Sequence, residues 1–375
     1  MKQKVNINAD ILTRAITRAG YKLHEFTEKA PNVREWIEGK KNPTVKQLEK
    51  FSKKVHLPYG YFFLSEPPTE KLPIPFFRTT GNDTDKVSVN VYDTILLIQQ
   101  RQDWLRDYLK DNEFEELPFV GSFTQRIVVE EVVNHMRDIL GLSEDWASEF
   151  ATWEEALAYL VEVIEDVGII TVFNGIVQNN TSRPLNVDEC RGFVLVDKIA
   201  PFMFINNADG KSAQMFTIVH ELAHIWIGQS AGFDFRKIQP ANDPSEIFCD
   251  KIAAEFLVPK NAFNKFWHSN PDIKKASKYF KVSEIVIARR ALDTNKIAKK
   301  EFFAFYENYK NREFYKKSNK SSGGDFYATK KKRLSITFAS HINRAVKSGQ
   351  LLYRDAYKLT GMKGDTFDKF FTKYL

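Results

Sequence analysis

The motif HELAH at residues 220–224 constrains the fold of this chain more than any other feature of its sequence. Uncharged residues flank the motif, TIV before it and IWIG after it, and this pattern is typical of a buried helix. Because residues four apart share a helix face, His220 and His224 can bind one metal ion, with Glu221 beside them to take a proton from water. Two hydrogen-bonded histidines on a half-buried helix would give the same letters, but the uncharged frame favours zinc.

A second predicted helix, from about Pro244 to Pro259, supplies the third ligand. A catalytic zinc site normally has three protein ligands and one open position, so two histidines are not enough. Glu246 and Asp250 are four residues apart and share a face, whereas Glu255 lies about 180° round the helix from Glu246. We therefore predict Glu246 as the third ligand and Asp250 as the acceptor for the remaining N–H of a ligating histidine. For Asp250, an exposed helix carboxylate is the alternative.

This ligand set predicts peptide hydrolysis. Zinc held by His220, His224 and Glu246 lowers the pKa of its bound water towards ~7, and Glu221 accepts the proton as that water attacks a peptide carbonyl. Glu221 can then pass the proton to the leaving amine.

Two further parts of such a site are less defined by the sequence. Asn206 and Asn207 are candidate donors to the oxyanion, although such residues before a helix more often shape a turn. Residues 192–196 form a candidate exposed strand edge, to which the backbone of an extended peptide can add.

The two motifs carry a family resemblance. The runs TIVHELAHIWIG and ExxCDKIAAEFLVPK resemble the ImmA/IrrE group of zinc peptidases, whose second motif is E-x-x-A-N-x-F-A-A-E-L-L-M-P. Glu246 falls on the ligand glutamate of that motif. Cys249 stands for Ala, Asp250 for Asn and Ile252 for Phe, and no metal-binding group is lost. The resemblance spans roughly residues 150 to 315, and it implies a zincin-like domain of the gluzincin type with Zn²⁺ as cofactor.

Composition indicates a folded cytoplasmic chain. Apolar residues make up 43% and charged residues 27% of the 375 residues, and this length favours two or three domains. No apolar run approaches the ~20 residues of a membrane span, and the start MKQKVNINAD lacks the apolar core of a secretory signal. We therefore expect no membrane partner. The two cysteines, Cys190 and Cys249, are too few for a disulfide framework, so we expect reduced thiols.

The net charge of +7 is unevenly distributed. Residues 1–75 hold 14 Lys and Arg against 8 Asp and Glu, and residues 296–375 hold 19 against 7, which leaves −11 for residues 76–295. A polyanion partner is therefore expected at the ends, although a lysine-rich face is more often simply solvated. The basic run 330–333, with Phe326, Tyr327 and Phe338 nearby, could bind single-stranded nucleic acid through charge and stacking. A solvated linker beside aromatic residues of the core explains the same residues equally well.

Hydrophobic periodicity predicts an α+β chain that is mainly helical. Val91, Ile95, Leu96 and Ile98 should form one apolar stripe, and a polar, basic stretch at 316–333 predicts a loop. The expected helices are 9–19, 23–29, 32–38, 45–55, 58–64, 88–110 and 126–167, further helix from 212 to 228 and from 244 to about 317, and a helical tail at 334–375, with strands at 168–173, 192–196 and 202–206.

These elements suggest four segments. They are an all-α helix-turn-helix domain (1–66), a proline-containing linker with a connecting helix (67–125), the zinc peptidase domain with a small sheet (126–317), and a basic linker with a helical C-terminal region (318–375).

Residues 9–64 resemble the XRE group of helix-turn-helix regulators, most clearly in the W-x-x-G-x-x-x-P turn from Trp36 to Pro43. In such domains the third helix enters the major groove. The resemblance places Asn32, Arg34 and Glu35 near bases and Lys40 and Lys41 on phosphates. The polar glutamine that usually opens the second helix is missing, so a docking or dimerisation platform is the alternative.

The whole arrangement resembles single-chain XRE and ImmA/IrrE fusions. It implies a cytoplasmic zinc endopeptidase tethered to a DNA-binding domain, which cleaves a regulatory protein of the repressor or antitoxin type and so switches transcription in a stress response. The alternative is a DNA-binding regulator whose zinc domain senses a signal without proteolysis. A homodimer is a further expectation, because operators tend to be palindromic.

Overall fold

The structure is a computed structural model that describes residues 4–66, 76–77, 88–123, 127–233, 243–311 and 325–375. The described residues fall into two compact units. The first lies within Met1–Pro73 and Asp83–Leu96, and the second within Ile74–Asn82 and Leu97–Leu375. Residues 67–75 of the predicted segment 67–125, the proline-containing linker with its connecting helix, are outside the described residues, and the four predicted segment boundaries remain predictions.

The first unit contains short helices that match the periodicity of the sequence. They are α1 (Ala9–Arg18), α2 (Leu23–Lys29), α3 (Pro31–Ile37), α4 (Val45–Val55) and the 3₁₀ helix η1 (Tyr59–Phe63). Thr44 and Gln47 form a capping box at the start of α4, and His56 ends that helix in the left-handed conformation. Leu12, Ile16, Leu48 and Phe51 are among the side chains that close the core of this unit.

Helix and strand content in the second unit confirms a mainly helical α+β fold. Its helices are α5 (Val89–Asp111, which starts within the first unit), α6 (Val129–Leu140), η2 (Trp146–Glu149), α7 (Trp153–Asp166), α8 (Lys211–Ile227), α9 (Pro244–Leu257), α10 (Lys260–Ser269), α11 (Ile273–Phe280), α12 (Glu284–Asp293), α13 (Lys299–Lys310), α14 (Phe326–Leu334), α15 (Ile336–Lys347), α16 (Tyr353–Thr360) and α17 (Asp365–Tyr374). None of the helices in the described ranges combines the length and apolar character needed to cross a bilayer.

A five-stranded sheet lies at the centre of this unit. The strands are β1 (Phe76–Phe77), β2 (Ile170–Phe173), β5 (Gly192–Leu195), β6 (Phe202–Ile205) and β7 (Ala231–Phe233), in the order β1-β7-β5-β6-β2. β5 pairs antiparallel with β6 and β7, and β2 and β1 pair parallel with β6 and β7 respectively. A separate hairpin joins β3 (Ile176–Val177) and β4 (Asn180–Pro184).

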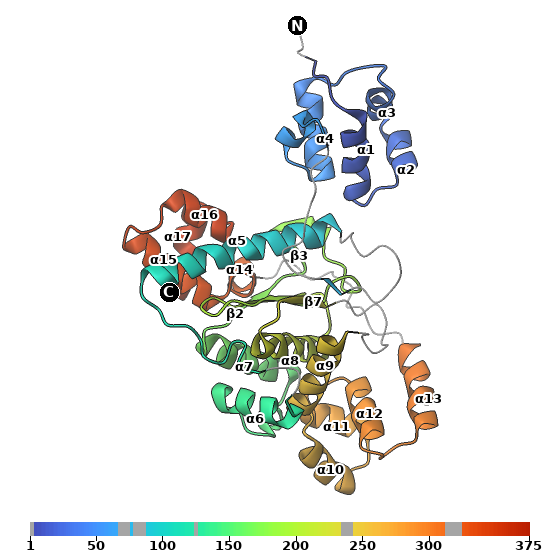
Figure 1. Ribbon diagram of the computed structural model, residues 1–375, viewed down its shortest axis with the longest axis vertical. Coiled ribbons are helices and arrows are strands. Elements are labelled where there is room, and N and C mark those ends of the chain that lie inside the picture. The colour runs from blue at the N-terminus through green and yellow to red at the C-terminus, as the bar shows by residue number, and fades with distance from the viewer. Residues whose placement is uncertain (1–3, 67–75, 78–87, 124–126, 234–242, 312–324) are drawn as a thin grey trace. The chain divides into compact units, whose positions relative to one another are not determined.

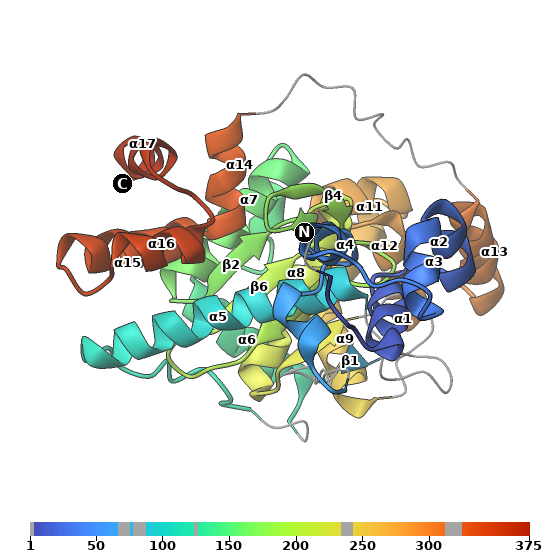
Figure 2. The same cartoon turned by 90° about the horizontal axis from the view of Figure 1, so that it is seen from above.

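Both faces of the sheet are covered by helices. Figures 1 and 2 show α7, α8 and α9 on one side of the sheet and α14 with the later part of α5 on the other. Val194, Met203 and Ile205 belong to the core that includes α8, whereas Phe202 on the alternate face contacts Phe338 of α15. Because β2, β5 and β6 are buried on both faces, these three strands are apolar runs rather than alternating ones.

Four expectations from the sequence are corrected by this fold. The predicted helix at 126–167 is interrupted, because Gly141 ends α6 in the left-handed conformation and Thr152 caps α7. The predicted loop at 316–333 contains α14, since Asp325 caps its first turn through the Tyr327 N–H. Leu96 does not join the apolar stripe: Val91, Ile95 and Ile98 are buried, but Leu96 is exposed.

The fourth correction concerns the expected strand edge at 192–196. β5 hydrogen-bonds to β6 on one side and to β7 on the other, so it has no free edge. A peptide cannot add to it as a further strand.

Candidate metal centre

Helix α8 carries the HELAH motif through the core of the second unit. Every residue of α8 from Thr217 to Ile227 is buried. Gly228 ends the helix in the left-handed conformation, and the backbone N–H groups of Gly121 and Phe123 donate to the Ile225 and Trp226 carbonyls. These bonds tie carbonyls in the last turn of α8 to the segment before α6, so they hold the end of α8 in place.

Helix α9 presents the predicted third ligand from its first turn. Asp243 caps α9 by accepting the Ser245 and Glu246 N–H groups at 2.8 and 3.4 Å, and Pro244 occupies the first helical position. The buried side of α9 packs along α8, which brings Glu246 against the two histidines.

The donor atoms of His220, His224 and Glu246 lie within 4.8 Å of one another. His220 Nε2 lies 3.2 Å from His224 Nε2 and 3.1 Å from Glu246 Oε2, and His224 Nε2 lies 3.2 Å from Glu246 Oε1. All three side chains are buried. Two imidazole nitrogens and a carboxylate therefore converge on one point, which is the donor set of a possible metal site.

Asp250 lies at the opposite side of the His220 ring. Its Oδ1 is 3.0 Å from His220 Nδ1, and its side chain is 37% exposed. An ionised carboxylate only accepts hydrogen bonds, so His220 donates through Nδ1 and turns the Nε2 lone pair towards His224 and Glu246. That lone pair faces a carboxylate, an arrangement that a shared cation or proton stabilises. The residues therefore fit a bound metal cation.

The pKa values of the site reflect this competition between burial and charge. Burial lowers the pKa of His220, but hydrogen bonds to Asp250 and Glu246 outweigh it and raise the pKa to about 10. Burial raises the pKa of Glu246, but hydrogen bonds to His220 and His224 lower it to about 2. Burial lowers the pKa of His224. The carboxylate of Glu246 thus stays ionised and the site attracts positive charge.

Glu221 is fully buried beside the ligands. Neither of its carboxylate oxygens has a hydrogen-bond partner within the described residues, and burial raises its pKa to about 8. A buried carboxyl group of this kind is costly unless another group later engages it. The position suits a group that exchanges a proton with a reactant.

Gly192 of β5 was not singled out by the sequence, but it lines the site. A Cβ built on Gly192 would lie 2.7 Å from Thr217 Cγ2, 2.9 Å from the Phe204 carbonyl oxygen and 3.4 Å from Glu221 Oε1. Only a residue without a side chain lets β5 approach α8 this closely. A glycine inside an apolar strand was the available signal, because it marks close approach of another group.

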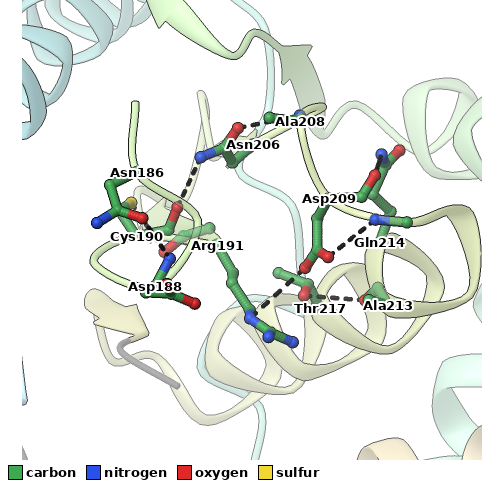
Figure 3. A network of polar contacts seen from close by, with 12 residues as sticks. Asn186, Asp188, Cys190, Arg191, Asn206, Ala208, Asp209, Ala213, Gln214 and Thr217 are labelled. Carbon is green, nitrogen blue, oxygen red and sulfur yellow. Dashed lines mark hydrogen bonds and ion pairs between the residues drawn. The ribbon is translucent and has the colours of Figure 1, made fainter. Parts of the chain in front are cut away.

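Asn206 has a structural role instead of a position at the site. Figure 3 shows its amide among the loops that precede α8, where Nδ2 donates to the Cys190 carbonyl at 2.9 Å and Oδ1 accepts the Ala208 N–H at 3.1 Å. The side chain is buried and its hydrogen bonds hold the turn after β6. Asn206 is therefore not available as an oxyanion donor, and Asn207 is exposed in the same turn.

The residues predicted to contact DNA lie on and after α3 in the first unit. Asn32 and Arg34 are exposed, as a contact role requires. Lys41 Nζ lies 2.8 Å from Glu35 Oε1, and Lys40 Nζ lies 2.7 Å from Glu38 Oε2. Both lysines therefore face a carboxylate that competes with a phosphate.

Comparison with known families supports the peptidase-like part of the chain. Residues 164–292 match peptidase family M78, described as the IrrE N-terminal-like domain. This range includes α8 and α9, and it supports the ImmA/IrrE resemblance for this part of the chain and a peptidase-like function. Residues 334–373 match a domain of unknown function, DUF8813, and neither range includes residues 1–66. No curated protein matched the chain.

Proposed function

We propose that this chain is a zinc-dependent endopeptidase coupled to a DNA-binding helical domain, and that it cleaves a regulatory protein of the repressor or antitoxin type. The observation that carries the proposal is the convergence of His220, His224 and Glu246 next to the unpartnered carboxyl group of Glu221. The match of residues 164–292 to a peptidase family points to the same chemistry.

Each residue has a defined part in the proposed reaction. His220, His224 and Glu246 would hold zinc, which supplies Lewis acidity that polarises a peptide carbonyl and acidifies water. Asp250 fixes the tautomer and orientation of His220 through the 3.0 Å contact to Nδ1. Glu221 takes the proton of the attacking water and returns it to the leaving amine.

Replacement of Glu221 by Gln tests the reaction without removing a ligand. We expect the variant to retain stoichiometric zinc and to lose turnover by at least about 100-fold, as for other general bases. Wild type and variant are expressed in the native host with and without DNA-damaging stress, and new protein amino termini are mapped by mass spectrometry. Glu162→Gln, which alters an exposed carboxylate of α7, is the matched control. Equal sets of new termini in wild type and Glu221→Gln would contradict the mechanism.

One observation favours a second function. His220, Glu221 and His224 are each fully buried, as expected for a site that senses a signal without admitting a peptide. In this alternative the chain is a DNA-binding regulator with a zinc-stabilised sensing domain. Bound zinc with no wild-type-specific termini under any condition would favour it.

The DNA-binding part of the proposal rests on the resemblance to XRE regulators and on the exposure of Asn32 and Arg34. Replacing Arg34 and Lys40 together by Ala is expected to weaken binding to duplex DNA from the promoter of this chain and to reduce its salt dependence. Binding at the wild-type level would indicate a docking or dimerisation role for the first unit. Sedimentation of the free and DNA-bound chain tests the proposed homodimer.

A further inference from the structure

The C-terminal helices gather basic and aromatic side chains from two separate segments. Residues 326–375 contain 11 Lys and Arg against 3 Asp and Glu. The start of α14 lies against the end of α17, where Lys373 Nζ is 5.4 Å from the Tyr327 ring and 5.3 Å from the Tyr374 ring. Lys331 Nζ lies 5.9 Å from the Tyr374 ring. Lysine side chains and aromatic rings therefore alternate where the start of α14 meets the end of α17.

The structure changes which residues belong to the basic and aromatic cluster expected from the sequence. Lys330 is buried and donates to Asn179 Oδ1 at 2.6 Å, and Phe338 is buried against Phe202 and Trp104. Both residues hold the C-terminal helices to the rest of the unit. Lys373 and Tyr374, which are more than 40 residues away in sequence, take their place beside Tyr327 and Lys331.

We propose that the α14–α17 surface, formed by Phe326, Tyr327, Lys331, Lys369, Lys373 and Tyr374, binds single-stranded nucleic acid. Single strands are bound by cations that follow the phosphates and by aromatic rings on which bases stack. Phe326 is 49% exposed, with Tyr327 at an interplanar angle of 86° and Lys330 Nζ 5.8 Å from its ring centroid, so about half of the residue stays accessible to a base. Lys369 is exposed one turn before Lys373 and extends the row of cations along α17.

Single-stranded nucleic acid fits this surface better than a folded acidic protein does. The rings stand among lysines at the meeting point of two helix ends, which offers stacking faces and positive charges together. The proposal is independent of the peptidase site and of the proposed duplex contacts on α3.

One carboxylate lies within the surface and competes for its cations. Asp325 Oδ2 lies 3.1 Å from Lys373 Nζ, and Asp325 Oδ1 accepts the Tyr327 N–H at 2.8 Å as the cap of α14. Asn can accept the same capping bond but does not neutralise Lys373. Asp365 and Asp368 lie in the first turn of α17, at the end opposite Lys373, although Asp365 is one turn before Lys369 on the same face.

The test measures the binding of fluorescein-labelled oligothymidylate of about 15 nucleotides to the full-length chain by anisotropy over a range of salt concentrations. Replacing Lys331, Lys369 and Lys373 together by Gln should weaken binding about tenfold or more and reduce the salt slope by about 2. Phe326→Ala should weaken binding about tenfold with an unchanged slope, because it removes stacking and no charge. Asp325→Asn should strengthen binding about two- to threefold because it frees Lys373.

Matched controls separate local contacts from overall charge and from the first unit. Lys265→Gln with Lys347→Gln removes exposed lysines on α10 and α15, and Asp272→Asn alters a comparable capping carboxylate on α11. Neither should change the affinity. Thermal melts check that every variant is folded. Three outcomes would each overturn the proposal. The triple lysine variant could bind with wild-type affinity, the Arg34→Ala with Lys40→Ala variant could lose binding, or the chain could bind duplex DNA but not oligothymidylate.

Discussion

Replacing Gly192 by Ala tests whether the close approach of β5 to α8 sets the position of Glu221. The added methyl group would meet Thr217 Cγ2 at 2.7 Å and the Phe204 carbonyl oxygen at 2.9 Å. Carbon atoms normally stay about 3.5–4.0 Å apart, so the strand and helix must separate by roughly 0.5–1 Å. The Phe204 carbonyl belongs to a ladder hydrogen-bonded to β5 and cannot rotate away.

Such overpacking costs about 2–3 kcal/mol of unfolding free energy, which lowers the melting temperature by roughly 4–10 °C in a unit of this size. Because Glu221 Oε1 is the third neighbour at 3.4 Å, the same displacement should lower peptidase turnover by about 10- to 100-fold while zinc stays bound. Differential scanning calorimetry, metal analysis and cleavage of a substrate identified from mapped termini measure the three effects.

Thr217→Ser provides the decisive comparison. Serine removes Cγ2 but retains the hydroxyl that donates to the Ala213 carbonyl at 3.0 Å. In the double variant part of the lost stability should return, which appears as a favourable coupling energy of about 1 kcal/mol in a double-mutant cycle. Gly60→Ala is the control, since its methyl group would meet nothing within 4 Å. An unchanged melting temperature in Gly192→Ala, or additive effects in the double variant, would refute the argument.

Three further predictions concern the metal, its supporting carboxylate and a remote histidine. Zinc at 100 times its Kd should add about 3 kcal/mol to the unfolding free energy of the wild type, and chelation should remove this contribution and lower the melting temperature. Chelation should leave Glu246→Gln nearly unaffected, and equal shifts in the two proteins would argue against the ligand set. Asp250→Ala removes the acceptor for His220 Nδ1 and should weaken zinc binding about 10- to 100-fold in competition with a chromogenic chelator, and wild-type affinity would remove Asp250 from its proposed role. Burial, with a smaller effect of Arg344, lowers the pKa of His341 to about 4, against ~6.5 when unfolded. Between these two pKa values the unfolded chain binds more protons than the folded chain, so stability falls as the pH falls. Relative to His341→Phe, the wild type should lose on the order of 2 kcal/mol of unfolding free energy from pH 6.5 to pH 4 in urea melts. Parallel pH profiles of the two proteins would contradict this.

Much of the local structure follows from patterns that neighbouring residues carry. α2 and α4 begin and end at the predicted residues, and the strands at 170–173, 192–195 and 202–205 lie within the predicted runs. The histidine spacing in α8 and the carboxylate spacing in α9 already specified which side chains share a face. Helical and strand periodicity are properties of a few adjacent residues, so they can be read without knowledge of the fold.

Tertiary structure decided the features that depend on residues distant in sequence. The packing of α9 along α8 brings Glu246 to the histidines, and the pairing of β5 on both sides removes the edge that residues 192–196 were expected to offer. Gly192 matters because β5 crosses α8 next to Glu221, and Lys373 joins Tyr327 because α17 returns to the start of α14. Sequence patterns determine which face of an element is apolar or reactive, whereas the contacts between faces arise only when long-range packing selects their neighbours.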